Sequence, residues 1–471
     1  MSKPTKKMLT VFSLVMVNIS LIAALRGLPT MAEYGFSIIF FLILAVVIFL
    51  IPVALISAEL ATGWPESGAI YVWVKEALGE RWGFVAIWTQ WIQNVVFYPT
   101  ALAAIAATAA FLYKPELATN PLFTIVIIFV VYWGATFINF RGLKISTIFT
   151  NVGTVLGVLV PGVLLMVCAA IWLATGHSSA IEFSWASFVP NMSNLSNIVF
   201  LTGVFLFFAG MEVSAVHVKE VGNPKKDYPK AIFISSVIIV AIFALGSLAI
   251  AIITPANEIS LTAGIMQTFM SVFKSLNVLW LVPVIAIVAI PGMIAQILNW
   301  IAGPSKALLV TAKDGCLPPF FQHINKHGMQ THIFITQGVV VSIISLVFVI
   351  LPSVSSSFWI LTALAAQMYL IVYLFMFVSA IVLKYKRADV KRAYTVPGGK
   401  IGMWIVGGVG IAAALFAFFL GYVPPAELET GSIFFYVGFL VVSLLILVGA
   451  PLLIYALRKP SWAKKVELKE K

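Results

Sequence analysis

One apolar segment of the chain carries an isolated carboxylate. Residues 205–218 read FLFFAGMEVSAVHV, in which Glu212 stands two positions after Gly210 among side chains that favour lipid or a protein core. A carboxylate in the middle of a membrane-spanning helix costs a few kcal/mol on insertion scales, so it must face a polar interior. Such a group can take up and release a proton, or it can hold a broken helix by accepting hydrogen bonds. A structural carboxylate, hydrogen-bonded within a helix bundle, is the alternative.

A second apolar segment contains residues that a plain lipid-facing helix would not need. In VNISLIAALRGLP, polar and helix-breaking residues fall close together: Asn18, Ser20, Arg26, Gly27 and Pro29. An interrupted helix frees backbone N–H and C=O groups, and the ends of its halves carry oriented dipoles. Irregular backbone is tolerated at membrane depth only where it lines a cavity. We therefore expect both segments to break near mid-membrane and to hold a small charged molecule between them.

The composition indicates that these segments lie in a membrane. Of the 471 residues, 61% are hydrophobic and 10% are charged, whereas soluble domains carry about 25% charged residues. About 20 apolar residues span a bilayer as a helix. Runs of this kind predict an all-α integral membrane protein with twelve transmembrane helices. The runs lie near residues 8–31, 36–60, 83–112, 121–139, 147–174, 195–218, 230–254, 277–311, 332–352, 357–384, 401–423 and 432–457.

The basic residues predict the orientation of the chain. With twelve spans, both termini lie on the same side of the membrane. If that side is the cytoplasm, all but three of the 29 Lys and Arg residues fall in inner segments, the exceptions being Arg26, Lys114 and Lys274. Cytoplasmic loops are enriched in Lys and Arg, so both termini are predicted to be cytoplasmic. Topology thus accounts for the net charge of +12, and no nucleic-acid partner is expected.

Two amphipathic stretches between spans indicate an internal repeat. One covers residues 63–83 and the other 255–277, a separation of about 190 residues that matches the offset between spans 1 and 6. Because five is an odd number, the second copy of a five-span unit inserts upside-down. The pattern predicts a LeuT-like 5+5 inverted repeat. Its units are residues 1–174, residues 175–384, and residues 385–471 with two accessory helices and a short tail.

Four motifs resemble those of the amino acid–polyamine–organocation transporters, and within them those of the glutamate/gamma-aminobutyrate antiporter branch. They are GMEVSAVHVKEVGNPKKDYPKAI at 210–232, EISLTAGIMQTF at 258–269, NWIAGPSKALLVTAKDGCLPP at 299–319 and KRAYTVPGGK at 391–400. The resemblance covers nearly the whole chain. It implies exchange, or proton-coupled uptake, of amino acids or their decarboxylated amines without ATP. No cofactor and no metal are implied.

The resemblance also implies a substrate site. The unwound part of the first span maps to residues 20–24, where the amides of Ala23 and Ala24 would receive a substrate carboxylate. Backbone donors at a helix start bind anions. The carbonyls of Ser20, Leu206 and Ala209 would face the substrate amine. Side chains at pocket-shaping positions of the family are Gln93 on the third span, Trp300 on the eighth, and Tyr369 and Tyr373 on the tenth.

Each of these side chains has a structural alternative. Trp300 can serve packing alone. Tyr369 and Tyr373 are spaced i, i+4 and share one helix face, so they can be core residues, although buried Tyr hydroxyls need partners. Gln93 and Asn94 are adjacent and face different directions, so we expect at most one of them to line the pocket.

Arg26 departs from the family pattern, because relatives that exchange glutamate tend to carry an aromatic residue and an acid at positions 25 and 26. In one interpretation Arg26 snorkels to the outer interface and pairs with Glu33. In the other it lies in the outer vestibule, where it attracts anionic or zwitterionic substrates and disfavours polyamines.

The residues leave two transport functions open, an amino acid exchanger and a proton-coupled symporter on the same fold. A channel would need a selectivity ring, and a membrane enzyme would need a catalytic cluster of His, Asp or Cys within spans. Neither pattern is present, so no enzymatic activity is expected. A chain of twelve spans without an organelle-targeting signal suits the bacterial cytoplasmic (inner) membrane. Expected partners are an amino acid or derived amine, membrane lipid and, for symport, protons; a homodimer is left open.

Overall fold

The part of the chain that the structure describes is helical, with no β-strand. The computed structural model describes residues 10–463 except positions 24, 67, 143–154, 191–194, 196–197, 214–222 and 427. Ten helices in this part are long and apolar enough to cross a membrane. Their bounds are Gly35–Gly63 (η2, α3, η3 and α4), Glu80–Ala110 (α6), Pro121–Phe140 (α7), Val155–Ala174 (η5 and α9), Lys226–Ile253 (within α12, Pro224–Ile253), Leu281–Lys313 (α14), Thr331–Ile350 (α15 and α16), Val354–Lys386 (α17), Gly399–Leu420 (α18) and Ile433–Ala456 (α19).

These ten helices coincide with ten of the twelve predicted apolar runs. The two longest runs, near residues 83–112 and 277–311, are the continuous helices α6 and α14 of 31 and 33 residues. The first and the sixth run differ from the rest, because each contains an interruption. These are the two runs in which the sequence placed polar and helix-breaking residues.

The interruption in the first run follows α1 (Val11–Ile22). The helix ends at Ala23, and a short 3-10 helix, η1 (Leu25–Gly27), leads into α2 (Leu28–Ala32). Pro29 stands in the first turn of α2, where its missing N–H costs nothing and its fixed φ favours a new helix start. The expectation of an unwound stretch beginning at position 20 is therefore wrong in its start, because residues 20–22 are still helical.

The interruption in the sixth run follows α11 (Leu201–Phe207), which is only seven residues long. The chain then turns at Gly210, whose φ is +116°. Residues that carry a Cβ rarely adopt this conformation, whereas glycine adopts it freely. Glycine at this position thus permits the turn that separates α11 from the single helical turn at residues 211–213.

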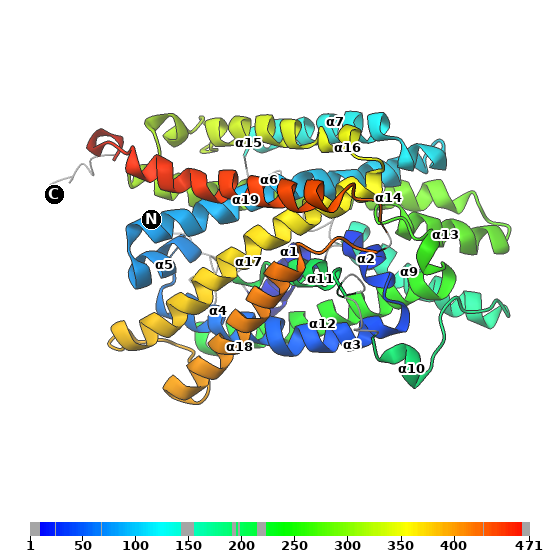
Figure 1. The fold of residues 1–471 in the computed structure, drawn as a ribbon, viewed down its shortest axis with the longest axis horizontal. Helices are drawn as coiled ribbons and strands as arrows, with labels where there is room; N and C mark the ends of the chain where they lie inside the picture. The colour runs from blue at the N-terminus through cyan, green and yellow to red at the C-terminus, as the bar shows by residue number, and fades with distance from the viewer. Residues whose placement is uncertain are drawn as a thin grey trace, which may run out of the picture.

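The two predicted amphipathic stretches contain helices that lie at opposite ends of the bundle. They are α5 (Ile70–Leu78) and α13 (Gly264–Ser275). In Figure 1, α5 lies at the left end beside the C-terminal end of α19, and α13 lies at the right end near α9 (Val160–Ala174) and α10 (Trp185–Phe188). The long helices run between these two ends.

Helix α6 forms the centre of the bundle. Nearly all of its residues are buried, and it packs against α5, α7, α14, α17 and α19. Helix α1 packs instead against α12, and the side-chain amide of Asn18 donates to Ser235 Oγ at 3.0 Å between them. The polar residues of α6 are consequently inside the protein and can face a central cavity.

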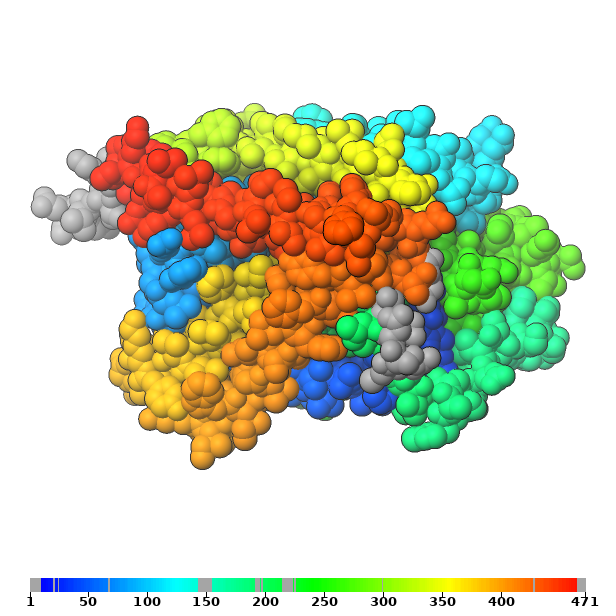
Figure 2. Space-filling view, viewed as in Figure 1, coloured from blue at the N-terminus to red at the C-terminus, as the bar shows by residue number. Residues whose placement is uncertain are grey.

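The outer helices present apolar side chains to the surroundings. Figure 2 shows α18 and α19, coloured orange to red, lying across the visible face. They carry exposed Trp404, Phe419, Phe434 and Leu445, each more than half accessible. Large apolar side chains with this exposure are unfavourable in water and are expected on helices that face lipid. The protein is therefore a multi-pass membrane protein.

Candidate functional site

Glu212 lies in a buried cluster of hydroxyl and amide groups. Its side chain is 1% exposed. Tyr369 Oη donates to Glu212 Oε1 at 2.5 Å, and Tyr373 Oη donates to Glu212 Oε2 at 2.6 Å. Gln90 Nε2 donates to Oε1 at 3.3 Å. The two tyrosines come from one face of α17, as their spacing predicts, and their rings stack at 5.0 Å. Among the described residues, these neutral donors hold the carboxylate and no cation pairs with it.

The same cluster holds the break of the sixth run. The amide of Gly210 donates to Tyr373 Oη at 2.9 Å, so this hydroxyl accepts from the backbone and donates to Glu212. A Cβ at Gly210 would lie 3.5 Å from the ring of Trp300 and 3.6 Å from Ile22. The carboxylate, its tyrosine and the turn therefore form one unit, which lies against both α14 and the end of α1.

The two interruptions meet beside a small central cavity of about 20 Å³. Residues near the break of the first run, Ile22 and Arg26, line it together with residues of the sixth. The other lining residues come from α6, α14 and α17. They are Gln93, Asn94, Phe97, Gln296, Trp300 and Tyr369, and the residues of the sixth run are Leu206, Phe207 and Ala209. A volume of this size accommodates about one water molecule, so the conformation described is closed around the cavity.

Two expectations about α6 and α17 need correction. Both Gln93 and Asn94 border the cavity, although we expected at most one. Neighbouring helix positions are separated by about 100°, and a cavity set against a buried helix can touch both. The side-chain amide of Asn94 donates to its own helix at the carbonyl of Gln90, at 2.8 Å. Tyr373 does not line the cavity, and its partners Glu212 and Gly210 do not line it either.

The backbone groups assigned to substrate are partly engaged within the chain. The amide of Ala23 donates to the carbonyl of Ile19 at 2.8 Å, and the carbonyl of Leu206 accepts from the amide of Ala209 at 3.0 Å. A free Ala23 amide is thus not found in this conformation, because α1 extends one turn further than expected. Ala24 lies outside the described residues, and Ser20 lies in the last turn of α1.

Arg26 is buried, which contradicts the interpretation that it snorkels to the outer interface. Its side chain is 6% exposed, and its guanidinium carbon lies 4.1 Å from the ring centre of Phe97 and 5.1 Å from that of Phe207. Gly27 allows this packing, because a Cβ there would come within 2.8 Å of Phe207. Burying an unpaired ion costs several kcal/mol. A cation–π contact returns about 0.5–2 kcal/mol, so the two rings offset only part of this cost.

Two polar residues at the site were not singled out from the sequence. Gln90 contacts Glu212, and Gln296 lines the central cavity. Both are amides inside long apolar helices, and Gln90 stands three positions before Gln93, on the same side of α6. An isolated amide in a membrane-spanning run is a signal that could have identified them. The aromatic partners of Arg26 carried no such signal, because Phe is common throughout this chain.

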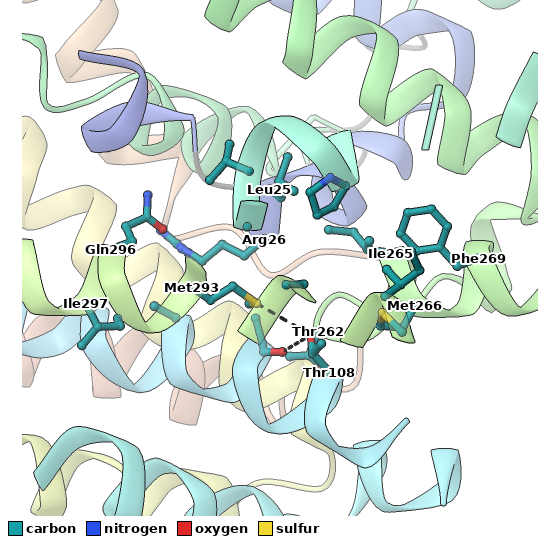
Figure 3. A pocket seen from close by; sticks show the side chains of 17 residues that line it. Leu25, Arg26, Thr108, Thr262, Ile265, Met266, Phe269, Met293, Gln296 and Ile297 are labelled. Atoms are coloured by element: carbon teal, nitrogen blue, oxygen red, sulfur yellow. Dashed lines mark hydrogen bonds between the residues drawn. The ribbon is translucent and has the colours of Figure 1, made fainter. Parts of the chain in front are cut away.

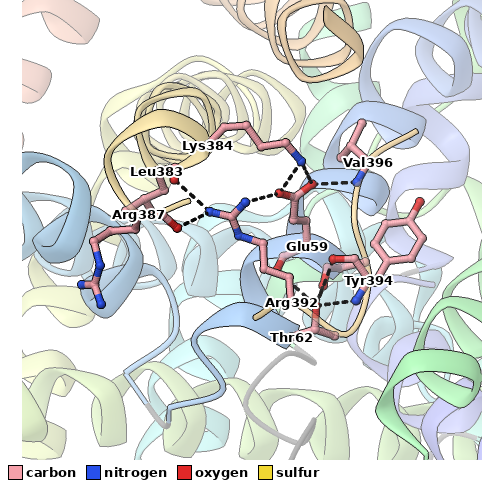
Figure 4. A network of polar contacts seen from close by, with 9 residues as sticks. Glu59, Thr62, Leu383, Lys384, Arg387, Arg392, Tyr394 and Val396 are labelled. Atoms are coloured by element: carbon pink, nitrogen blue, oxygen red, sulfur yellow. Dashed lines mark hydrogen bonds and ion pairs between the residues drawn. The ribbon is translucent and has the colours of Figure 1, made fainter. Parts of the chain in front are cut away.

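A second buried carboxylate lies where α4 (Ile51–Gly63), α17 and the segment before α18 meet (Figure 4). Glu59 Oε1 pairs with Lys384 Nζ at 2.9 Å and with Arg392 at 3.1 Å. Its Oε2 accepts from the amide of Val396 at 2.6 Å. Arg392 also donates to the carbonyls of Leu383 and Arg387. This cluster fastens three segments together and lines none of the central cavity.

Chemically, the central site combines helix ends, amides, aromatic rings and one carboxylate. Free carbonyls near a helix end and a carboxylate suit an ammonium group, whereas amide donors suit an anion. No group of three or more metal-binding side chains occurs among the described residues. Ten apolar helices around a buried polar cavity give the architecture of a multi-pass membrane transporter.

Comparison with known proteins gives the family. The family model described as amino acid permease matches residues 9–445, nearly the whole chain. The chain belongs to this family, and the resemblance to amino acid–polyamine–organocation transporters is confirmed. Its relatives are transporters, in agreement with the expectation that the chain is not an enzyme, and a small molecule is the expected cargo.

Individual relatives cover nearly the full length. An uncharacterized transporter of Legionella pneumophila is 42% identical over 447 residues, 95% of this chain and 96% of that protein. A glutamate/gamma-aminobutyrate antiporter of Lactococcus lactis subsp. lactis is 31% identical over 458 residues, 96% of this chain and 91% of that protein. The crystal structure of MhsT in complex with L-phenylalanine shares the fold, with a TM-score of 0.58 at 13% identity over 88% of this chain and 100% of that chain.

Proposed function

We propose that this protein is a secondary active amino acid antiporter of the bacterial cytoplasmic membrane. It exchanges an amino acid for another amino acid or a derived amine by alternating access. The observation that carries this proposal is the meeting of two interrupted helices at one buried polar cavity. Antiporter activity in a relative that is 31% identical over 96% of this chain supports the exchange mode.

The proposed topology has twelve crossings. The ten long helices supply ten of them, and the two interrupted runs supply the first and the sixth. Residues 1–174 and 175–384 form the two inverted repeats, and residues 385–471 add two accessory helices. The positions of α5 and α13 at opposite ends of the bundle support this inversion (Figure 1). Both termini are placed in the cytoplasm by the Lys and Arg distribution.

The proposed substrate lies in the central cavity with its charged ends on the two breaks. Its carboxylate binds backbone amides near Ala23 and Ala24, after the last turn of α1 opens. Its ammonium group binds the carbonyls of Ser20, Leu206 and Ala209. Opening is required because the Ala23 amide is bonded to Ile19 and the cavity is small in the closed conformation.

Side chains complete the proposed pocket. Gln93 and Trp300 border the substrate, and Tyr369 closes one side of the pocket. Tyr373 lies outside the cavity and supports the pocket through its hydrogen bond to Glu212. Glu212 and Gly210 keep the sixth run broken. In the antiporter, the carboxylate stays bonded to its tyrosines through the cycle and supports the shape of the pocket.

A proton-coupled symporter is the second candidate function. The buried carboxylate favours symport, because every partner of Glu212 among the described residues is neutral. Such a carboxylate could take up and release a proton. The same fold and the same substrate site serve both functions. The difference lies in what drives uptake.

Counterflow in proteoliposomes separates the two functions. Purified protein is reconstituted, and uptake of labelled amino acids is measured into vesicles that are empty or preloaded with unlabelled amino acids or amines, with and without an inward proton gradient. An antiporter requires preloading and no gradient. A symporter fills empty vesicles when the gradient is present. Failure of every amino acid and amine to be transported under either condition would overturn both proposals.

A further inference from the structure

We propose that Arg26 binds the side-chain carboxylate of an acidic amino acid substrate. In the closed conformation its guanidinium closes one side of the central cavity, and the substrate displaces the neighbouring rings of Phe97 and Phe207 when it binds. This inference rests on the proposed amino acid transport. It adds the substrate class, a dicarboxylic amino acid, and a residue that selects it.

The position of Arg26 places it between two cavities. One is the central cavity beside Trp300 and Tyr369. The other, of about 40 Å³, extends toward α13 and is lined by Ile265, Met266 and Phe269 of that helix. Arg26 and Gln296 line both cavities, and Figure 3 shows the guanidinium end of Arg26 directed toward Gln296. A molecule that occupies either cavity therefore lies close to the guanidinium.

The guanidinium has unused capacity to bind an anion. Among the described residues, the buried Nε of Arg26 has no hydrogen-bond partner, and the only hydrogen bond of its terminal nitrogens is a long one, 3.4 Å from Nη1 to Thr100 Oγ1. Among the described residues no carboxylate pairs with it. Arginine remains charged in proteins and presents a planar fork of donors that matches the two oxygens of a carboxylate. An incoming carboxylate would satisfy donors that the protein itself leaves unpaired.

The location of Arg26 favours a side-chain carboxylate over the α-carboxylate. In the proposed function, the backbone at the end of α1 receives the α-carboxylate. Arg26 follows in the next turn of the chain, η1, and its guanidinium lies over the ring of Phe97, which lines the same cavity. A substrate with one carboxylate leaves the guanidinium unpaired, whereas a second carboxylate at the end of a short side chain can reach it. A diamine would bring a second positive charge to the same place and is disfavoured.

The proposal is tested with L-glutamate and L-glutamine, which have nearly the same shape and differ by one carboxylate. Counterflow kcat/KM is measured for both in wild-type protein, in Arg26→Met, which retains length without charge, and in Arg26→Lys, which retains charge without the fork. Lys114→Met, which removes an exposed charge outside both cavities, is the matched control. Monodispersity and thermal stability of each purified variant are recorded.

Wild-type protein and Lys114→Met are expected to favour glutamate over glutamine. In Arg26→Met that preference should fall roughly tenfold to a hundredfold, the equivalent of one hydrogen-bonded charge pair, with glutamine transport retained. Arg26→Lys should retain part of the preference. If Arg26→Met does not fold, the glutamate preference of the wild type and its partial reduction in Arg26→Lys decide the question, and an unchanged preference in Arg26→Lys would count against the proposal.

Three results would overturn the proposal while leaving amino acid transport intact. One is a wild type that transports glutamine at least as well as glutamate. Another is an equal loss of both substrates in Arg26→Met. The third is transport of neutral amino acids that requires chloride in place of gluconate, because the anion at Arg26 would then be inorganic. A wild type that transports no amino acid would instead refute the proposed function itself.

Discussion

The two buried carboxylates of this protein are held in opposite ways. Glu59 pairs with Lys384 and Arg392, whose side chains are 10% and 7% exposed, and also accepts from a backbone amide. Glu212 accepts from two tyrosine hydroxyls and one amide side chain. The first carboxylate is neutralised inside the fold. The second is hydrogen-bonded but has no opposite charge among the described residues.

The buried arginines differ in the same way. Arg392 has a carboxylate, two backbone carbonyls and the ring of Trp64 around it. Arg26 has two phenylalanine rings and one long hydrogen bond. Charges that fasten segments together are thus compensated by the protein, whereas the charges beside the central cavity have no opposite charge among the described residues. We propose that a ligand or a proton compensates them.

The largest expected effect on stability comes from breaking the compensated cluster. Glu59→Ala leaves Lys384 and Arg392 buried without their anion, and the free energy of unfolding should fall by about 3–5 kcal/mol. Denaturant unfolding in detergent measures this change. Asp389→Asn, which alters an exposed carboxylate beside Arg387, is the control and should leave unfolding unchanged. Equal stability of Glu59→Ala and wild type would contradict the comparison.

Glu212→Gln should affect transport more than stability. The amide retains the volume of the side chain but removes the charge that two tyrosines and Gln90 surround, so transport should fall roughly tenfold or more. Proteoliposome uptake across a pH series measures both the rate and its pH dependence. Tyr369→Phe, which removes one donor, is the graded control and should cost less. Full transport with an unaltered pH profile in Glu212→Gln would show that the carboxylate is structural.

Gly210→Ala tests whether the break depends on backbone conformation. A Cβ at Gly210 meets only ordinary contacts at 3.5 Å or more, so steric overlap is not the problem. The φ of +116° is strained for alanine, and the cost should be about 1–3 kcal/mol, with reduced transport. Gly303→Ala in α14, where a Cβ meets nothing within 4 Å, is the control. Equal unfolding and uptake in the two variants would refute the argument.

The smallest effect is expected at an exposed ion pair. Lys75 and Asp314 pair at 3.2 Å with side chains 38% and 37% exposed, and such pairs contribute about 0.2–1 kcal/mol. Tyr71 also donates to Asp314 at 2.8 Å. Burial, followed by this hydrogen bond, raises the pKa of Tyr71, so Tyr71 remains a donor at neutral pH. Asp314→Asn should therefore change unfolding only slightly.

Salt distinguishes this pair from the Glu59 cluster. Added salt screens exposed charges and should remove most of the difference between Asp314→Asn and wild type. It should leave the deficit of Glu59→Ala nearly intact, because that cluster is buried. Unfolding measured at low and high salt provides both values, and a salt-sensitive Glu59 deficit would contradict the burial argument.

The long helices could be predicted from the sequence because each depends on a local property, about 20 consecutive apolar residues. The position of the two interruptions could be predicted for a related reason, since Gly210 and Pro29 act on their own backbone. The end of α1 could not be located to the residue, because residues 20–22 have no strong preference against helix. Helix α1 as a whole packs against α12, and such tertiary packing can extend a helix beyond its local preference.

The partners of the charged groups could not be predicted, because they are distant in the chain. Tyr369 is 157 positions from Glu212, and Lys384 is 325 positions from Glu59. A sequence pattern reports that a carboxylate is unusual in its segment. It does not report whether a lysine or a tyrosine will pack against that carboxylate. Glu59, at the end of its apolar run, was not predicted as a buried charge.

The sequence by itself determined that this protein lies in a membrane, where its helices run and which two of them break, because hydropathy and backbone preference act over neighbouring residues. Only the tertiary structure decided that Glu212 receives tyrosine hydroxyls, that Glu59 receives cations and that Arg26 is buried between aromatic rings. Those outcomes depend on which side chains the packed helices bring within hydrogen-bonding distance, and that distance is set by the whole bundle.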